Sequence, residues 1–186
     1  MESVGFKEWA LVCEALGRGE QTIILRKGGI AEGRDGFSFR HREFFLFPTF
    51  FHEQVEKMRG DSSVIPPRRD GEIEINFFAR LERAVVITAW ERAAALEPFH
   101  LLRADVVRER FEYAEAPGIH VAFLRVFRLA SPWLFPDAPK YGGCRSWVTL
   151  PSDAANGALQ PVLSDAEFAE RLRAFRSVVE PQTATA

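Results

Sequence analysis

Apolar residues recur at helical spacing near both ends of the chain. The first stripe is followed by Gly17 and Gly19, two glycines that favour the end of a helix. It consists of Phe6, Trp9, Ala10, Cys13 and Leu16. The second stripe follows Ser164, a good N-cap residue with acidic residues directly after it. It consists of Phe168, Leu172, Phe175 and Val179. The pattern predicts helices over residues 5–17 and 164–179.

Between these helices, β-branched and aromatic residues form segments typical of strands, bounded by glycines and prolines. The expected strands are residues 21–27, 37–39, 44–47, 72–86, 120–129 and 141–150, and shorter helices are expected at 52–59, 91–96 and 104–113. Residues 120–129 are apolar on both faces, which is typical of a strand in the middle of a sheet. The sequence therefore predicts an α+β fold with a mixed or mostly antiparallel sheet and flanking helices.

The length and composition favour a single hydrophobic core. The chain has 186 residues, of which 47% are hydrophobic, and its 17 Phe against two Tyr indicate that most aromatic rings are packed inside. We expect one globular domain over residues 1–180, with a frayed tail at 181–186. If any weak subdivision exists, it falls in the proline-containing loop at residues 60–71.

Charge and cysteine content exclude several classes of protein. The formal net charge is −2, so the molecule is not coated in positive potential, although a local patch is compatible with it. Cys13 and Cys144 lie far apart in sequence, which leaves no disulfide framework and no Cys-rich zinc site. The N-terminus does not have the pattern of a signal peptide, and no segment has the roughly 20 apolar residues that cross a bilayer. We expect a cytoplasmic protein without a membrane partner.

Candidate chemistry is concentrated in residues 24–52, where cations, glycines, histidines and phenylalanines lie close together. Between positions 26 and 42, five cations against two anions give a local charge of +3. Arg26 and Lys27 end an expected strand, and Gly28 and Gly29 follow as a turn whose backbone N–H groups can cradle a phosphate. The alternative is an ordinary hairpin with charged ends. The GxxxxGK[ST] spacing is absent, so no nucleotide hydrolysis is implied.

His41, Arg42 and Glu43 offer acid–base chemistry, because residues 41 and 43 of a strand share a face. The His-x-Glu motif is the first half of a zinc deaminase signature. The second half, Pro-Cys-x-x-Cys, is missing, which argues against zinc-dependent deamination. His52 adds another nitrogen donor, yet the spacing does not require a metal, and we predict no metal or cofactor. The alternative is that His41 braces a loop.

A second candidate segment lies late in the chain, where Arg145 and Ser146 follow two glycines. Glycines allow a ligand to come close, so both side chains can point into a pocket beside His41. Trp147 is expected in the core.

Residues 7–53, together with Arg125–Leu129 and Tyr141–Val148, resemble a family of uncharacterised prokaryotic proteins, catalogued as domain of unknown function 1802. The resemblance spans nearly the whole chain. The family has no assigned activity, and some members resemble fusions to restriction-endonuclease-like domains, which implies work near DNA.

Three hypotheses for the function follow. The first is a nucleic-acid-associated binding domain, accessory to a prokaryotic restriction or defence system, that contacts DNA or RNA. Its candidate residues are Arg26, Lys27, Gly28, Gly29, Arg42, His52 and Arg145. The second is an enzyme acting on a small anionic metabolite or nucleotide, with His41 and Glu43 as acid–base partners. The third is a protein-interaction domain. Substrate, oligomeric state and partner proteins are not encoded in any recognisable motif.

Overall fold

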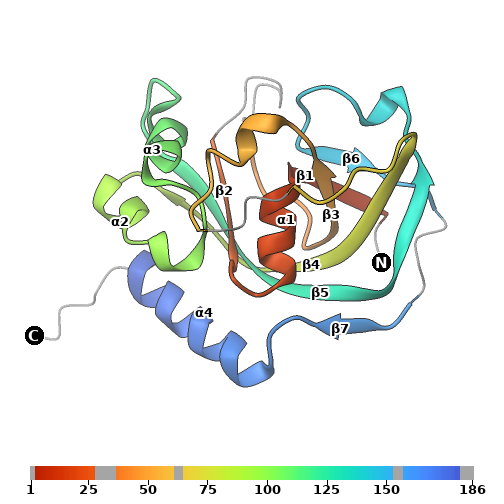
Figure 1. Cartoon of the computed structure of the whole chain (residues 1–186). Helices are drawn as coiled ribbons and strands as arrows, with labels where there is room; N and C mark the ends of the chain where they lie inside the picture. The colour runs from red at the N-terminus through yellow and green to blue at the C-terminus, as the bar shows by residue number, and fades with distance from the viewer. Residues whose placement is uncertain (1–2, 28–36, 61–64, 153–156, 181–186) are drawn as a thin grey trace, which may run out of the picture.

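The computed structural model describes residues 3–27, 37–60, 65–152 and 157–180 (Figure 1). Its sheet has seven strands: β1 (Val4–Trp9), β2 (Ile23–Arg26), β3 (Glu43–Thr49), β4 (Glu72–Ile87), β5 (Ile119–Pro136), β6 (Trp147–Thr149) and β7 (Leu159–Pro161). The α-helices are α1 (Ala10–Gly17), α2 (Trp90–Ala94), α3 (Ala104–Glu112) and α4 (Asp165–Val179). Single turns of 3₁₀ helix occur at η2 (His52–Gln54), η3 (Glu97–Phe99) and η4 (Pro139–Tyr141).

The strands follow the order β2-β5-β4-β3-β1-β6, and β7 pairs with β5 outside this path. β1 pairs with β3 in parallel, whereas the other pairings are antiparallel. The predicted α+β class, with a mixed sheet and flanking helices, is confirmed. Among the described residues, no helix is long and apolar enough to cross a membrane.

Two clusters of buried side chains occupy the two sides of β3. Phe44 belongs to a large cluster that includes α1 and residues of α2, α3 and α4, whereas Phe45 belongs to a smaller one with Phe78 and Trp133. Successive residues of a strand point to opposite faces, which is why neighbouring phenylalanines enter different cores. Figure 1 shows β4 and β5 as a long, curved pair, with α1 lying over the sheet and α4 running along β5.

The predicted helix over residues 5–17 is partly wrong, because residues 4–9 form β1 and the helix begins at Ala10. β1 lies between β3 and β6, and Phe6 is fully buried there. Pairing with two neighbours outweighs the local helical spacing of Phe6 and Trp9.

Several strand boundaries also differ from the prediction. β5 continues beyond residue 129, where the expected strand ends, to Pro136, because Pro136 still pairs with Glu72 at the start of β4. β4 is one continuous strand, with a register shift between Leu81 and Arg83. Residues 37–39 were expected as a strand but lie outside any strand. The strand expected at 141–150 is shorter and consists of β6, Trp147–Thr149. The helix expected at 52–59 is the single 3₁₀ turn η2, His52–Gln54. β3 extends past the expected strand end at residue 47, so that Pro48 lies inside it.

The C-terminal helix agrees closely with the prediction. The Ser164 side chain accepts from the backbone N–H of Glu167, and the Glu167 side chain accepts from the backbone N–H of Ser164, which forms a capping box. Phe168 and Phe175 are the buried residues of α4, and both pack against Phe123 of β5. The helix stripe therefore covers the face of β5 that the sequence pattern predicts as buried.

Candidate nucleic-acid interface

The edge strands β2 and β6 are joined by a side-chain hydrogen bond. Arg26, the last residue of β2, donates through Nη2 to the Ser146 hydroxyl oxygen over 2.6 Å. Ser146 directly precedes β6 and is 3% exposed. Because β2 and β6 are the outer members of the sheet order, this contact links two strands that share no backbone ladder.

Residues 37–41 also pack between the strands near this hydrogen bond. The Phe37 ring contacts His120 of β5 edge to face at 5.2 Å, and it contacts Phe6 of β1 at 6.2 Å. The indole N–H of Trp147 donates to the Ser38 carbonyl over 3.3 Å. The segment before β3 therefore packs against strands on both sides.

Trp147 is the centre of an aromatic cluster at this place. Its ring lies 4.7 Å from Phe6, 4.7 Å from His41 and 5.2 Å from Phe44, measured between ring centroids. The expectation that Trp147 belongs to the core is confirmed, since it is 7% exposed. His41 is half-buried against it.

A second arginine reaches the end of β2 from α3. Arg110 is 8% exposed and donates through Nη1 to the Leu25 carbonyl. Its guanidinium carbon lies 4.4 Å from the Trp9 ring centroid, a cation–π geometry. Burial lowers the pKa of Arg110; the nearby Glu8 carboxylate raises it, and Arg26 lowers it further.

Glu8 is the buried acid of the site. It is 1% exposed, and its Oε1 accepts from the Trp9 backbone N–H over 2.9 Å. Its Oε2 is buried with no hydrogen-bond partner in the part of the chain that the structure describes. Sequence reasoning missed both Glu8 and Arg110. One signal was present for Arg110, which completes the helical stripe of Val106, Val107 and Phe111, where a charge is unexpected.

The structure brings three predicted segments together: the end of β2 with Arg26, the segment with His41, and the segment with Arg145 and Ser146. Arg42 and Arg145 are exposed. The Lys27 ammonium lies 3.5 Å from the ring centroid of Tyr113, beside the end of α3. His52 is exposed at the start of η2. Gly28 and Gly29 lie outside the described residues.

His41 and Glu43 are not brought together. Glu43 accepts from Arg80 Nε over 2.8 Å, and the Arg80 guanidinium lies over Phe127, a residue of the smaller core. His41 packs instead on Trp147, which belongs to the larger core on the other side of the sheet. Residues 41 and 42 precede β3, so the alternation that would place both side chains on one face does not extend to His41.

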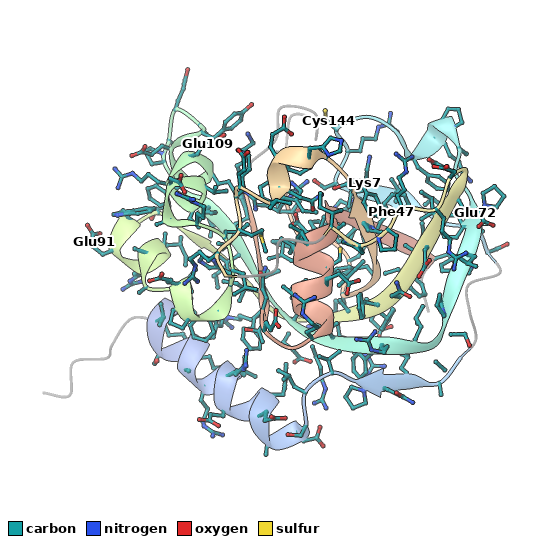
Figure 2. The ribbon with its side chains drawn as sticks, in the orientation of Figure 1. Lys7, Phe47, Glu72, Glu91, Glu109 and Cys144 are labelled. Atoms are coloured by element: carbon teal, nitrogen blue, oxygen red, sulfur yellow. The ribbon has the colours of Figure 1, made fainter. Side chains whose placement is uncertain are left out.

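Lys7 supports the segment that carries Arg145 and Ser146. Its backbone N–H donates to the Ser146 carbonyl over 2.8 Å, and its Nζ donates to the carbonyls of Tyr141 and Gly143, each over 2.7 Å. Burial lowers the pKa of Lys7, and Arg26 lowers it as well, while Cys144 and Asp137 raise it. Figure 2 shows Lys7, Phe47 and Cys144 on the same side of the molecule.

The described residues offer no cluster of metal-binding side chains. Within residues 3–27, 37–60, 65–152 and 157–180, no group of three or more His, Cys, Asp or Glu side chains could hold a metal ion. The site that the structure assembles is cationic and aromatic, with one buried carboxylate.

The fold is of the α+β class, and the candidate site is a group of cationic and aromatic side chains where the ends of the outer strands β2 and β6 meet. The chain belongs to the family described as domain of unknown function (DUF1802), which matches residues 5–174, so the resemblance seen in the sequence is confirmed. No curated protein matches the chain.

Similar solved structures include ASCH from Zymomonas mobilis, with 14% identity, a TM-score of 0.48, and coverage of 91% of this chain and 92% of that one. A point variant of ZmASCH from the same organism gives 12% identity and a TM-score of 0.49, with coverage of 91% and 93%. At these values the likeness carries no conclusion about function.

Proposed function

We propose that this protein is a nucleic-acid-binding domain that contacts the phosphate backbone with the surface around Arg26, Arg42 and Arg145. The observation that supports this most directly is the pair of contacts Arg26–Ser146 and His41–Trp147. These contacts draw three cation-bearing segments, distant in sequence, to one edge of the sheet. A phosphate backbone is recognised by such a group of cations.

The exposed charge at this edge is positive. Arg40, Arg42 and Arg145 are all exposed, and Arg26 is half-buried behind them. The nearest acid in sequence, Glu43, is paired with Arg80 on the other face of the sheet. Since the whole chain carries only −2, attraction of a polyanion depends on this local surface, which we call the Arg42–Arg145 surface.

The aromatic side chains favour a single strand over a duplex. Phe39 and His41 are half-buried next to the exposed arginines, and an unpaired base can stack on such rings. Phe39 contacts Phe6 at 5.5 Å, and His41 contacts Trp147, so both rings are held in place before any ligand binds. A preordered ring loses less entropy on binding than a mobile one.

The test measures binding of labelled single- and double-stranded DNA and RNA at two salt concentrations. The variant Arg42→Gln/Arg145→Gln removes two exposed cations without touching the Arg26–Ser146 bond. We expect weaker binding and a shallower slope of log affinity against log salt. On a single strand the slope should fall by about 0.7 for each phosphate that the variant no longer neutralises.

A matched control is Arg173→Gln/Arg176→Gln, which removes two exposed cations from α4, on the opposite side of the molecule from β6 in Figure 1. This control should bind as tightly as the unmodified protein. An equal decrease of affinity in both variants would indicate general charge attraction, and no salt-dependent binding by the unmodified protein would refute the proposal.

The finer part of the proposal is a cytoplasmic role as an accessory to a prokaryotic restriction or defence system, and it is supported only by the family resemblance. Its test compares plating of DNA phages on cells with and without the protein. The role is supported if the unmodified protein reduces phage plating and the Arg42→Gln/Arg145→Gln variant does not. It is refuted if the unmodified protein leaves plating unchanged.

A further inference from the structure

A cavity with a volume of about 480 Å³ lies on the face of β1 opposite to Glu8. Its lining includes Lys7, Phe47, Thr49, Arg68, Asp137 and Tyr141, and we call it the Lys7 pocket. Because Lys7 and Glu8 are consecutive residues of a strand, their side chains leave it in opposite directions. The pocket has the size of a small-molecule site and is much larger than a single phosphate requires.

The apolar lining of the pocket suits a flat ring. The Phe47 and Tyr141 rings pack together at 5.5 Å, and both are almost fully buried, so they form a firm floor. Pro48 and Phe50, which also line the pocket, are half-buried and offer apolar surface above that floor. Planar heterocycles bind such aromatic and proline surfaces by stacking.

The polar lining suits an anion. The Lys7 ammonium is held by the Tyr141 and Gly143 carbonyls, which uses two of its three N–H groups. The third N–H has no acceptor among the residues that the structure describes, and Lys7 lines the cavity. Arg68 stands at the rim, where its Nη2 donates to Asp137 over 3.1 Å. Two cations against one carboxylate leave the pocket with a net positive charge.

We propose that the Lys7 pocket binds a nucleoside monophosphate unit, with the base on the aromatic floor and the phosphate on Lys7 and Arg68. An ammonium fixed by two carbonyls forms a charge-assisted hydrogen bond to phosphate without first losing rotamer freedom. The unit can be a free nucleotide or the phosphorylated end of a strand, since both present the same ring and phosphate.

The first experiment measures equilibrium binding of the full chain to adenosine and uridine monophosphates, to the corresponding nucleosides, and to inorganic phosphate. We expect the monophosphates to bind about tenfold or more tightly than either component, and Lys7→Gln to remove that advantage. Because Lys7 also holds backbone carbonyls, thermal melting of the variant is measured in parallel.

The rim variant Arg68→Gln supplies a second test at an exposed position, where folding should be unaffected, and we expect it to weaken monophosphate binding by about threefold to tenfold. A second pair of ligands, a 5′-phosphorylated and a 5′-hydroxyl oligonucleotide, separates the sources. A preference for the phosphorylated strand without binding of the free nucleotide assigns the pocket to strand ends. No binding of either ligand at millimolar concentration, or unchanged binding in folded Lys7→Gln and Arg68→Gln, would overturn the proposal.

The outcome is independent of the proposed function. Arg42→Gln/Arg145→Gln should lose affinity for a 5′-hydroxyl polynucleotide and keep the monophosphate affinity, whereas Arg68→Gln should weaken monophosphate binding and keep the affinity for a 5′-hydroxyl polynucleotide. Each surface can therefore fail alone.

Discussion

Arg26 and Ser146 are 120 positions apart in sequence, and a 2.6 Å hydrogen bond between their side chains joins the two outermost strands of the sheet. Arg26 also lies over the Phe6 ring at 5.4 Å, so its guanidinium is fixed by one polar and one aromatic contact. Because of these two contacts, Arg26 stabilises the fold in addition to any contact that it makes with a ligand. Its removal is therefore a poor test of binding, and the exposed Arg42 and Arg145 are better targets.

Ser146→Ala should destabilise the protein by about 1–3 kcal/mol, because the guanidinium of Arg26 loses its hydroxyl acceptor in a half-buried place. Urea unfolding measures the change. Ser177→Ala is the matched control, since the Ser177 hydroxyl is exposed on α4 and donates to the Ala174 carbonyl of its own helix. The control should change the free energy of unfolding by about 0.5 kcal/mol or less. Equal stability of the two variants would show that the Arg26–Ser146 bond contributes little.

Arg110→Met should cost about 3 kcal/mol, because it removes a buried guanidinium that binds the Leu25 carbonyl and stacks on Trp9. Glu8→Gln removes the nearby buried negative charge. If the two charges stabilise each other, the double variant should be more stable than the sum of the single effects predicts, by about 0.5 kcal/mol or more. A double-mutant cycle from urea unfolding measures this coupling, and strictly additive effects would contradict it.

The sequence predicted the α+β class, the position of β5 inside the sheet rather than at its edge, and the N-cap of α4, because each depends on a local pattern. Residues 120–129 are apolar on both faces, and Ser164 is followed at the third position by Glu167. The strand β1 was mistaken for a helix because Phe6 and Trp9 fit helical spacing, and only pairing with β3 and β6 decides the matter.

For the candidate site, the sequence predicted which segments carry cations but not how they meet. Arg26, His41 and Ser146 come together through long-range contacts that no local spacing encodes. The suggested His41–Glu43 pair assumed a strand that continues back to residue 41, and β3 begins only at Glu43. Glu8 was missed because an acid inside a predicted amphipathic helix is expected on the exposed face. Its burial becomes evident only when residues 4–9 are known to form a strand between β3 and β6.

Gly17→Ala tests the packing of α1 against the sheet. A Cβ atom built at Gly17 would lie 2.0 Å from the Phe77 ring, so either the ring or the helix must move. We expect a loss of about 1–3 kcal/mol in the free energy of unfolding, although alanine is the better helix former. Gly157→Ala is the control, because its nearest neighbour would be Ala130 Cβ at 3.9 Å. A neutral effect at Gly17 would mean that Phe77 repacks without cost.

The buried His100 should make stability depend on pH. Burial, together with the charges of Arg59 and Arg110, lowers its pKa from 6.5 to about 4, and its Nδ1 accepts from the Leu102 backbone N–H over 3.1 Å. The folded protein therefore keeps this imidazole neutral at pH values where the unfolded chain has already bound a proton. Its contribution to stability is complete above about pH 6.5 and is lost as the pH falls towards 4.

Integrated over that interval, the loss amounts to about 3 kcal/mol. His100→Asn preserves an acceptor near Nδ1 and removes the titrating group, so it is the matched variant. Urea unfolding of both proteins between pH 4 and pH 7 should show a stability difference that shrinks or reverses as the pH falls, because only the unmodified chain binds the extra proton when it unfolds. If the stabilities of the two proteins changed with pH in parallel, a lowered pKa of His100 would be contradicted. Any loss of stability in acid would then come from the carboxylates.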